Sequence, residues 1–309
     1  WEPNRLGALP LLAQAARLGL APLAQAEALL AHWCAANPPY RGRNWACGQE
    51  AAFRALHLAL TLALLDGDTA LQPAARQFLA LHARRIAATR GYARAQDNNH
   101  PISEAAGLHV IGLLLRDPSM AAGAARDLGR SVARLVAPDG EFAQPSPQYH
   151  RLLLDTLFLT VFLARRLHGP PLPALVTQRA AAATTWLLRL ADPMTGALPR
   201  IGHGDDSALG DLSLDDRQDA RGSLERAARL FLGASAGFAG DAGCVWLGLA
   251  CPDGRVAQVD AWRSASWRGW SGAGARGVLR GGAPLRFRPT HCDLLPVSYT
   301  HLRAHETRE

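Results

Sequence analysis

The stretch EAAFRALHLALTLALL, residues 50–65, decides the fold class. Apolar side chains stand on nearly every side of a helix built from these residues, so we predict a helix buried on most faces. Apolar residues also recur at a spacing near 3.6 in the flanking segments 23–34 and 73–88. The same pattern predicts further helices at 104–116, 120–135, 151–168, 173–191 and 215–233. Short connections between them predict antiparallel helical hairpins, stacked in a solenoid or closed into a ring.

Composition narrows the class of protein. The chain has 309 residues, 49% of them hydrophobic and 19% charged, which excludes a disordered protein. Its formal net charge is +7, and all 33 basic residues are arginine, so an anionic partner is favoured. Aromatic residues make up only 6%, and no basic run is interleaved with them, which argues against nucleic acid. The most apolar stretch, 152–167, is shorter than the ~20 residues a bilayer needs, so we expect no membrane span.

The character of the sequence changes after residue 235. Apolar residues alternate over 243–250, a Pro-Asp-Gly turn follows at 252–254, and 255–262 resumes as an extended run, which predicts a hairpin. We therefore expect a helical domain at 1–235 and a short β domain at 236–295. The stretch 296–309 fits neither pattern and resembles translated sequencing-adapter read-through at the end of a metagenomic fragment, so we expect a non-native tail.

Two polar clusters precede predicted helices. Asp97, Asn98, Asn99 and His100 form the first, which is typical of a turn and helix start, with Ser103 as a candidate cap.

In the second cluster, Tyr149 and His150 stand at the start of a long apolar helix. They could place a phenol and an imidazole on one rim, where proton transfer is possible. Alternatively, the tyrosine ring packs in the core and exposes only its hydroxyl.

Three other pairs of residues leave alternatives open. Asp205 and Asp206 could bind a cation or act as acid and base, although a Gly-Asp-Asp turn is more often structural. Glu50 and Arg54, at spacing i,i+4, could form an ion pair within a helix, or Arg54 could meet a substrate carboxylate.

His291 and Asp293 make up the third pair. Their strand-like spacing points both side chains to one face, as in part of a metal site or a catalytic imidazole with its carboxylate.

In this order, the motifs resemble the heparinase II/III-like family of polysaccharide lyases. The matching pieces cover residues 1–295. They are NP-x-x-x-G-x-NW (37–45) with Glu50 and Arg54, NNH (98–100), DG-x-F (139–142), S-x-x-YHR (146–151), LPRIGHGDDS (198–207) and RPTHCDLL (288–295). The resemblance implies a mainly α fold: an incomplete (α/α) toroid followed by the start of an antiparallel β-sandwich domain. It also implies β-elimination on a uronic-acid-containing anionic polysaccharide, such as a glycosaminoglycan or alginate.

The resemblance also implies a role for each candidate residue in the β-elimination. Removing the C5 proton of a uronate requires donors that neutralise its carboxylate, a base, and an acid for the leaving oxygen. The resemblance implies Asn99 as the neutralising residue, assisted by His100. Tyr149 would be the general acid, and also the base when deprotonated, with His150 orienting it. His291 would serve either the chemistry or a structural metal.

The resemblance also implies substrate contacts at Glu50, Arg54, Asn98 and Arg151. No cofactor is expected for the chemistry, but a complete β domain could hold a structural zinc or calcium ion. A periplasmic or secreted location follows by analogy only. The family often has an acidic residue where Gln144 stands, and its β domain continues beyond residue 295. The hypothesis therefore includes an incomplete metal site, and it leaves open whether the chain is active as it stands.

Three alternatives compete with a lyase. A glycoside hydrolase on a similar toroid could act through Asp97, Asp205 or Asp206. A non-catalytic polysaccharide-binding or assembly protein could keep the toroid without turnover. A helical scaffold protein would leave Asn99, His100 and Tyr149 scattered on separate faces.

Overall fold

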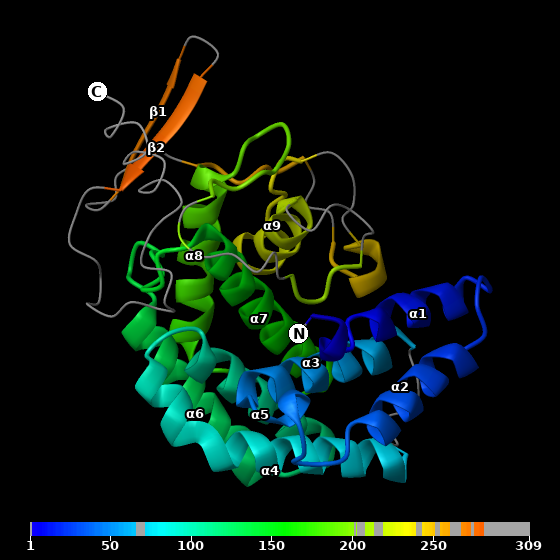
Figure 1. The fold of residues 1–309 in the computed structure, drawn as a ribbon. Coiled ribbons are helices and arrows are strands. Elements are labelled where there is room, and N and C mark those ends of the chain that lie inside the picture. The colour runs from blue at the N-terminus through cyan, green and yellow to red at the C-terminus, as the bar shows by residue number, and fades with distance from the viewer. Residues whose placement is uncertain are drawn as a thin grey trace, which may run out of the picture.

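The computed structural model describes residues 2–65, 72–200, 202, 208–212, 219–238, 243–250 and 254–259, and the backbone of two strands. This part of the chain is mainly helical, as predicted (Figure 1). The predicted tail at 296–309 lies outside the described residues, and the division into domains stays a prediction. The α-helices are α1 (Ala8–Arg17), α2 (Ala24–Ala36), α3 (Gly48–Leu64), α4 (Pro73–Gln96), α5 (His100–Leu115), α6 (Pro118–Leu135), α7 (Pro147–Arg166), α8 (Ala174–Leu190) and α9 (Arg221–Ala227).

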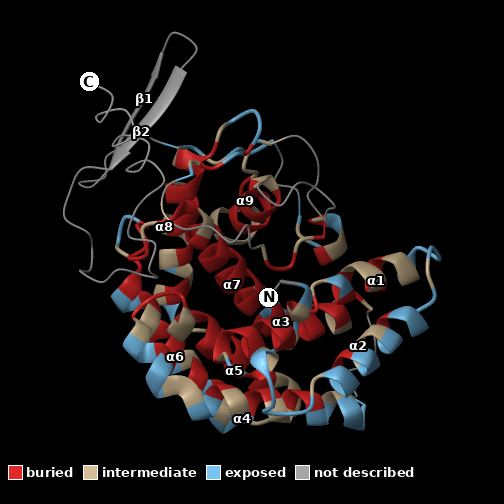
Figure 2. Ribbon diagram, in the orientation of Figure 1, coloured by how far each residue is buried: buried red, intermediate tan, exposed pale blue. Residues whose placement is uncertain are grey.

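Helices α3, α5 and α7 form the buried centre. Nearly all residues of α3 and most of those of α5 and α7 are buried, whereas α4 and α6 expose one side to solvent (Figure 2). Helix α5 contacts both α3 and α7, and α9 follows against α7. The stretch that decided the fold class therefore lies in the core, as its apolar surface requires.

Proline and side-chain caps fix where several helices begin. Proline occupies the first turn of α4, α5, α6 and α7, where its missing N–H costs no hydrogen bond. Asp117 caps α6 by accepting a 2.9 Å bond from Met120 N, and Ser146 caps α7 by accepting a 3.3 Å bond from Tyr149 N. These caps fix the first turn of α7, which carries Tyr149 and His150.

The start of α5 differs from the prediction. The helix begins at His100 rather than at residue 104, because Pro101 fits its first turn. Ser103 therefore lies inside the helix and does not cap it. Its hydroxyl donates back to Asn99 O at 3.0 Å, a bond that serine commonly makes within helices.

The predicted hairpin over 243–262 is wrong in its described part. Val245–Leu247 form one turn of 3-10 helix, flanked by Gly243 and Gly248 at φ of +77° and +63°. Val245 is 73% exposed while Leu247 is 8% exposed, so the alternating residues do not share a face. Val256 instead pairs in parallel with Ser235. The two glycines adopt the left-handed conformation and turn the chain here, so the alternating apolar residues do not form a strand.

The described strands lie further along the chain. β1 (Trp267–Gly272) pairs with β2 (Ala275–Arg280) in an antiparallel ladder with Trp267 opposite Arg280. They fall within the segment predicted to be β-rich. A β-sandwich is not established by two strands.

Close contact between α3 and α5 depends on glycine. A Cβ on Gly107 of α5 would lie 2.5 Å from Ala52 Cβ and 2.8 Å from Ala52 Cα of α3. Real side chains do not approach so closely, so one helix would have to move. The two backbones can pack at this distance only without a side chain at residue 107.

We expect Gly107→Ala to lower the free energy of unfolding by about 1–3 kcal/mol, because the methyl group overpacks a rigid helix contact. Gly91→Ala in α4 is the control, since a Cβ there meets nothing within 4 Å. That substitution should stabilise by up to about 1 kcal/mol through helix propensity. Denaturant unfolding of both variants checks this, and equal effects would contradict the packing argument.

Candidate functional site

The predicted motifs before α3 and α5 come together. Gln49 Nε2 in the first turn of α3 donates to Ser103 Oγ in the first turn of α5 at 2.9 Å. One turn further along each helix, Ala52 touches Gly107. The two helices are therefore parallel, and their N-termini lie side by side.

The start of α7 lies at the same end. Arg134 at the end of α6 holds Asp97, just before α5, through bonds of 2.7 and 2.8 Å. The loop after α6 folds back, with Ala143 N donating to Leu135 O at 2.8 Å, and α7 begins four residues later.

Part of a further motif joins this end of the helices. A Cβ on Gly202 would lie 2.6 Å from Pro145 O, so Gly202 lies directly beside the start of α7. We call the end of the molecule formed by the starts of α3, α5 and α7 the motif end.

Asn99, at the motif end, is buried but lacks hydrogen-bond partners for its side chain among the described residues. It is 3% exposed, yet neither its Oδ1 nor its Nδ2 has a hydrogen-bond partner among the residues that the structure describes. Gln144, in the loop before α7, is 2% exposed and its two amide atoms are equally without partners. A buried amide without a partner costs free energy, so each such group calls for a ligand or a water molecule.

His100 lies beside Asn99 among polar groups. Its Nδ1 is 3.9 Å from Glu104 Oε1 and 4.0 Å from Cys47 Sγ. Burial alone would lower the pKa of His100, but the hydrogen bonds to Cys47 and Glu104 outweigh it and raise the pKa to about 9. Burial raises the pKa of Glu104. His100 is therefore a cation at neutral pH, next to an unpaired amide.

Tyr149 and His150 face different surroundings. Tyr149 is 5% exposed and lies in the first turn of α7 at the motif end. His150 stacks on Trp186 of α8, with ring centroids 4.6 Å apart, and its Nε2 bonds to Ala183 O at 2.9 Å. Burial lowers its pKa to about 4, so the ring is neutral. His150 supports α7 against α8.

Arg54 lies in the core. It is fully buried, and its guanidinium carbon lies 4.7 Å from the Trp33 ring and 5.6 Å from the Trp45 ring. Its Nε donates to His82 Nε2 at 3.0 Å. Burial lowers its pKa to about 10, so it stays cationic. This environment gives Arg54 a structural role and offers no route to a substrate carboxylate.

Glu50 and Asn98 also have structural partners. Glu50 accepts bonds of 2.8 to 3.1 Å from Arg5 rather than pairing with Arg54 within the helix. Asn98 Oδ1 accepts a 3.0 Å bond from His100 N and so shapes the turn that carries Asn99.

Arg151 belongs to a buried ionic network between α7 and α9. Its Nε donates to Ser223 Oγ at 2.9 Å, and Ser223 in turn donates to Asp155 at 3.1 Å. Asp155 also lies 3.5 Å from Arg226. These contacts hold α7 to α9, and they give Arg151 a structural role.

Four predicted residues, His291, Asp293, Asp205 and Asp206, lie outside the described residues. The proposed metal ligand is therefore among the residues that the structure does not describe. Asp97, the other candidate of the hydrolase alternative, gives both carboxylate oxygens to Arg134.

Sequence reasoning missed Glu104 and Cys47 as partners of His100. The spacing His100–Glu104 (i,i+4) was a readable signal for the first. Nothing in the sequence links Cys47 to a residue 53 positions away.

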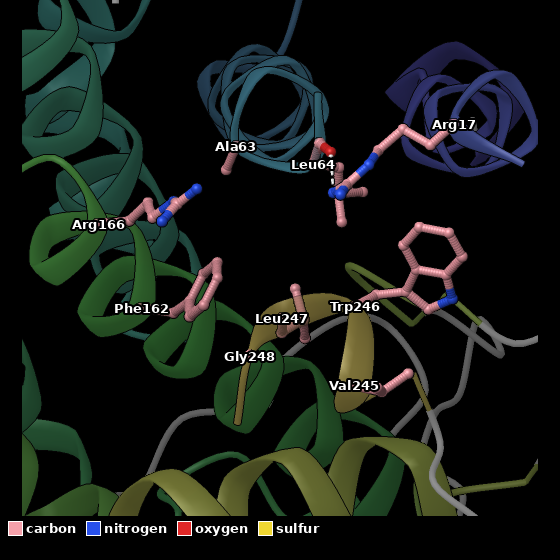
Figure 3. A pocket seen from close by; sticks show the side chains of 9 residues that line it. All are labelled: Arg17, Ala63, Leu64, Phe162, Arg166, Val245, Trp246, Leu247 and Gly248. Carbon is pink, nitrogen blue, oxygen red and sulfur yellow. Dashed lines mark hydrogen bonds between the residues drawn. The ribbon is translucent and has the colours of Figure 1, made fainter. Parts of the chain in front are cut away.

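A cavity of about 400 Å³ lies at the opposite end of α3 and α7 (Figure 3). Arg17 and Arg166 reach toward it from two sides, and Arg17 Nη1 donates to Leu64 O at 2.8 Å. Its lining residues include none of the predicted site residues. They are Arg17, Ala63, Leu64, Phe162, Arg166, Val245, Trp246, Leu247 and Gly248.

Comparisons with protein-family models, with curated proteins and with solved structures found no match to this chain. Among the described helices, none combines the length and the apolar character needed to cross a bilayer.

His100 should make stability depend on pH. Its pKa of about 9 exceeds the 6.5 of an unperturbed histidine, so its charge stabilises the fold below pH 6.5 and the effect is lost as pH rises through 9. We expect His100→Gln to cost roughly 1–3 kcal/mol at pH 6 and much less at pH 10. Denaturant unfolding at both pH values measures this. The exposed control His32→Gln should change little at either, and a loss at His100 that does not vary with pH would contradict the assignment.

Arg54→Lys should lower the free energy of unfolding by about 2–3 kcal/mol, because a lysine ammonium lacks the planar guanidinium that lies over Trp33 and Trp45 and donates to His82 and to Asn44 O. The exposed Arg43→Lys serves as control and should change it by less than about 0.5 kcal/mol. Thermal unfolding compares the two; a neutral Arg54→Lys would argue that the guanidinium is not held by its surroundings.

Proposed function

We propose that the chain is a polysaccharide lyase that cleaves a uronic-acid-containing anionic polysaccharide by β-elimination. The proposal includes the ring form of the helical domain, the incomplete (α/α) toroid, and a following β-sandwich domain. The motifs quoted from the sequence suggest the reaction, and the geometry at the motif end supports it.

The observation that carries the proposal is the unpaired amide of Asn99 beside a cationic His100. β-Elimination builds negative charge on the uronate carboxylate when the C5 proton leaves. An amide N–H and an imidazolium N–H are the donors that such a carboxylate needs. Both are held in advance at the first turn of a buried helix, so binding does not have to arrange them.

Tyr149 is the proposed proton donor to the leaving glycosidic oxygen. It begins the neighbouring helix at the same end, and α5 and α7 are in contact. The phenol then completes a set of amide, imidazole and hydroxyl around one sugar acid. His150 acts as a positioning residue: through its stack on Trp186 it fixes the turn on which Tyr149 stands.

Asn99→Ala tests the carboxylate role. We expect kcat on a polyuronate to fall about 10²–10³-fold, the usual cost of losing one donor to a developing oxyanion. The free energy of unfolding should stay equal or rise, because the substitution removes buried polar atoms that have no partner. A loss of stability at this residue would indicate a structural amide. Gln178→Ala, at an exposed residue of α8, is the matched amide control and should change neither quantity.

Tyr149→Phe tests the proton donor. Formation of the unsaturated uronate, followed by its near-ultraviolet absorbance, should stop while polymer binding stays nearly unchanged. Tyr92→Phe, at an exposed tyrosine of α4, is the control and should retain activity. Cleavage without the chromophore would favour a hydrolase. Binding without any cleavage by the unsubstituted chain would favour a non-catalytic polysaccharide-binding protein.

A further inference from the structure

Positive charge is concentrated on two helices. Helix α4 contains five arginines and no acidic residue, and α6 contains three arginines and one aspartate. Their combined charge of +7 equals the net charge of the whole chain. The rest of the sequence therefore has no net charge. The anionic partner that the composition suggests is expected to bind at α4 and α6.

Asp127 shows that this charge is not neutralised locally. Arg90, Arg94 and Arg130 all pair with its single carboxylate, and their side chains are 42%, 58% and 68% exposed. Burial and the charges of Arg94 and Arg130 lower the pKa of Arg90. Three guanidinium groups around one carboxylate leave a surplus of two positive charges facing solvent.

A groove runs between α4 and α6 along the outer side of α5. Its larger part is a cavity of about 450 Å³ with mostly small or apolar walls, edged by Arg84 and Arg90. Beyond Arg90 and Leu108 lies a much smaller space of about 20 Å³, which is also lined by Pro101 and Glu104 in the first turns of α5. Beside it, the ion pairs of Arg90 and Arg94 with Asp127 join α4 to α6. From Leu115 to Pro101 the groove spans roughly 20 Å along the helix. It ends beside His100.

We propose that the larger cavity between α4 and α6 binds a linear anionic polysaccharide, whose chain runs from there over the ion pairs of Arg90 and Arg94 with Asp127 toward the motif end. The inference rests on the proposed function for the identity of the polymer as a polyuronate. The small apolar walls, such as Ala83, Ala87 and Ala124, suit the C–H face of sugar rings. The guanidinium groups at the edges suit carboxylate substituents through paired N–H donors.

Nucleic acid fits the groove less well. A duplex carries its phosphates on a convex surface that is too broad to enter a groove between neighbouring helices. Single strands bind on aromatic side chains that stack with bases, and the described residues lining the groove include no aromatic ring.

Binding to polygalacturonate, measured by calorimetry without reference to turnover, tests the groove. Arg84→Gln/Arg94→Gln removes two edge charges and leaves Arg90 and Arg130 to pair with Asp127. We expect about tenfold weaker binding and a smaller dependence on salt. The charge-matched control Arg165→Gln/Arg179→Gln, on α7 and α8, should weaken binding less than about twofold. Asp127→Asn should tighten it, because it releases three arginines.

Equal losses in the two double variants would overturn the proposal, since net charge alone would then explain binding. Tighter binding of duplex DNA than of polygalacturonate, lost in the groove variant, would also overturn it. Groove-dependent binding without unsaturated product would keep the groove and refute the lyase. Unsaturated product with groove-independent binding would keep the lyase and refute the groove.

Discussion

The close packing of α3 on α5 is the constraint on which the rest of the structure depends. Gly107 lets the backbones meet at Ala52, and the Gln49–Ser103 bond fixes the register one turn away. Because both helices are buried, neither can slide without opening a core of close-packed side chains. The first turns of α3 and α5 are thereby fixed side by side. The turn with Asn98 and Asn99 lies beside the residues that precede α3.

Buried polar residues divide into two groups. Glu50 and Arg151 have well-placed partners within the chain, and so does Arg54 at Nε and Nη2, although its Nη1 has none among the described residues; each joins elements far apart in sequence. The amides of Asn99 and Gln144 have none. Stable cores satisfy their polar groups, and the exceptions tend to be functional sites. This contrast separates residues that hold the fold from those available to a ligand, although all five are equally buried.

The helical class was predictable because a long, almost wholly apolar stretch such as 50–65 can only be a buried helix or strand, and its neighbours share a helical period. Helix ends were less predictable: α4 continues eight residues beyond the predicted end at 88, through a polar surface turn with no stop signal. The pairing of Glu50 with Arg5 rather than Arg54 depends on a contact 45 residues away, which local spacing cannot reveal. The environment of Asn99 was equally unpredictable. The sequence identified Asn99 as a candidate site residue, but it could not show whether its amide is hydrogen-bonded within a turn or lacks a partner.

The basic face of α4 and α6 is built from arginine alone, in a chain without lysine. Guanidinium groups keep their proton far into the alkaline range, unlike amines, which titrate and acylate readily. Enzymes that acetylate lysine, and amine-directed labelling or crosslinking reagents, thus find no target on these helices. The positive charge of this face therefore cannot be lowered by lysine acetylation, the commonest modification that neutralises a cationic surface.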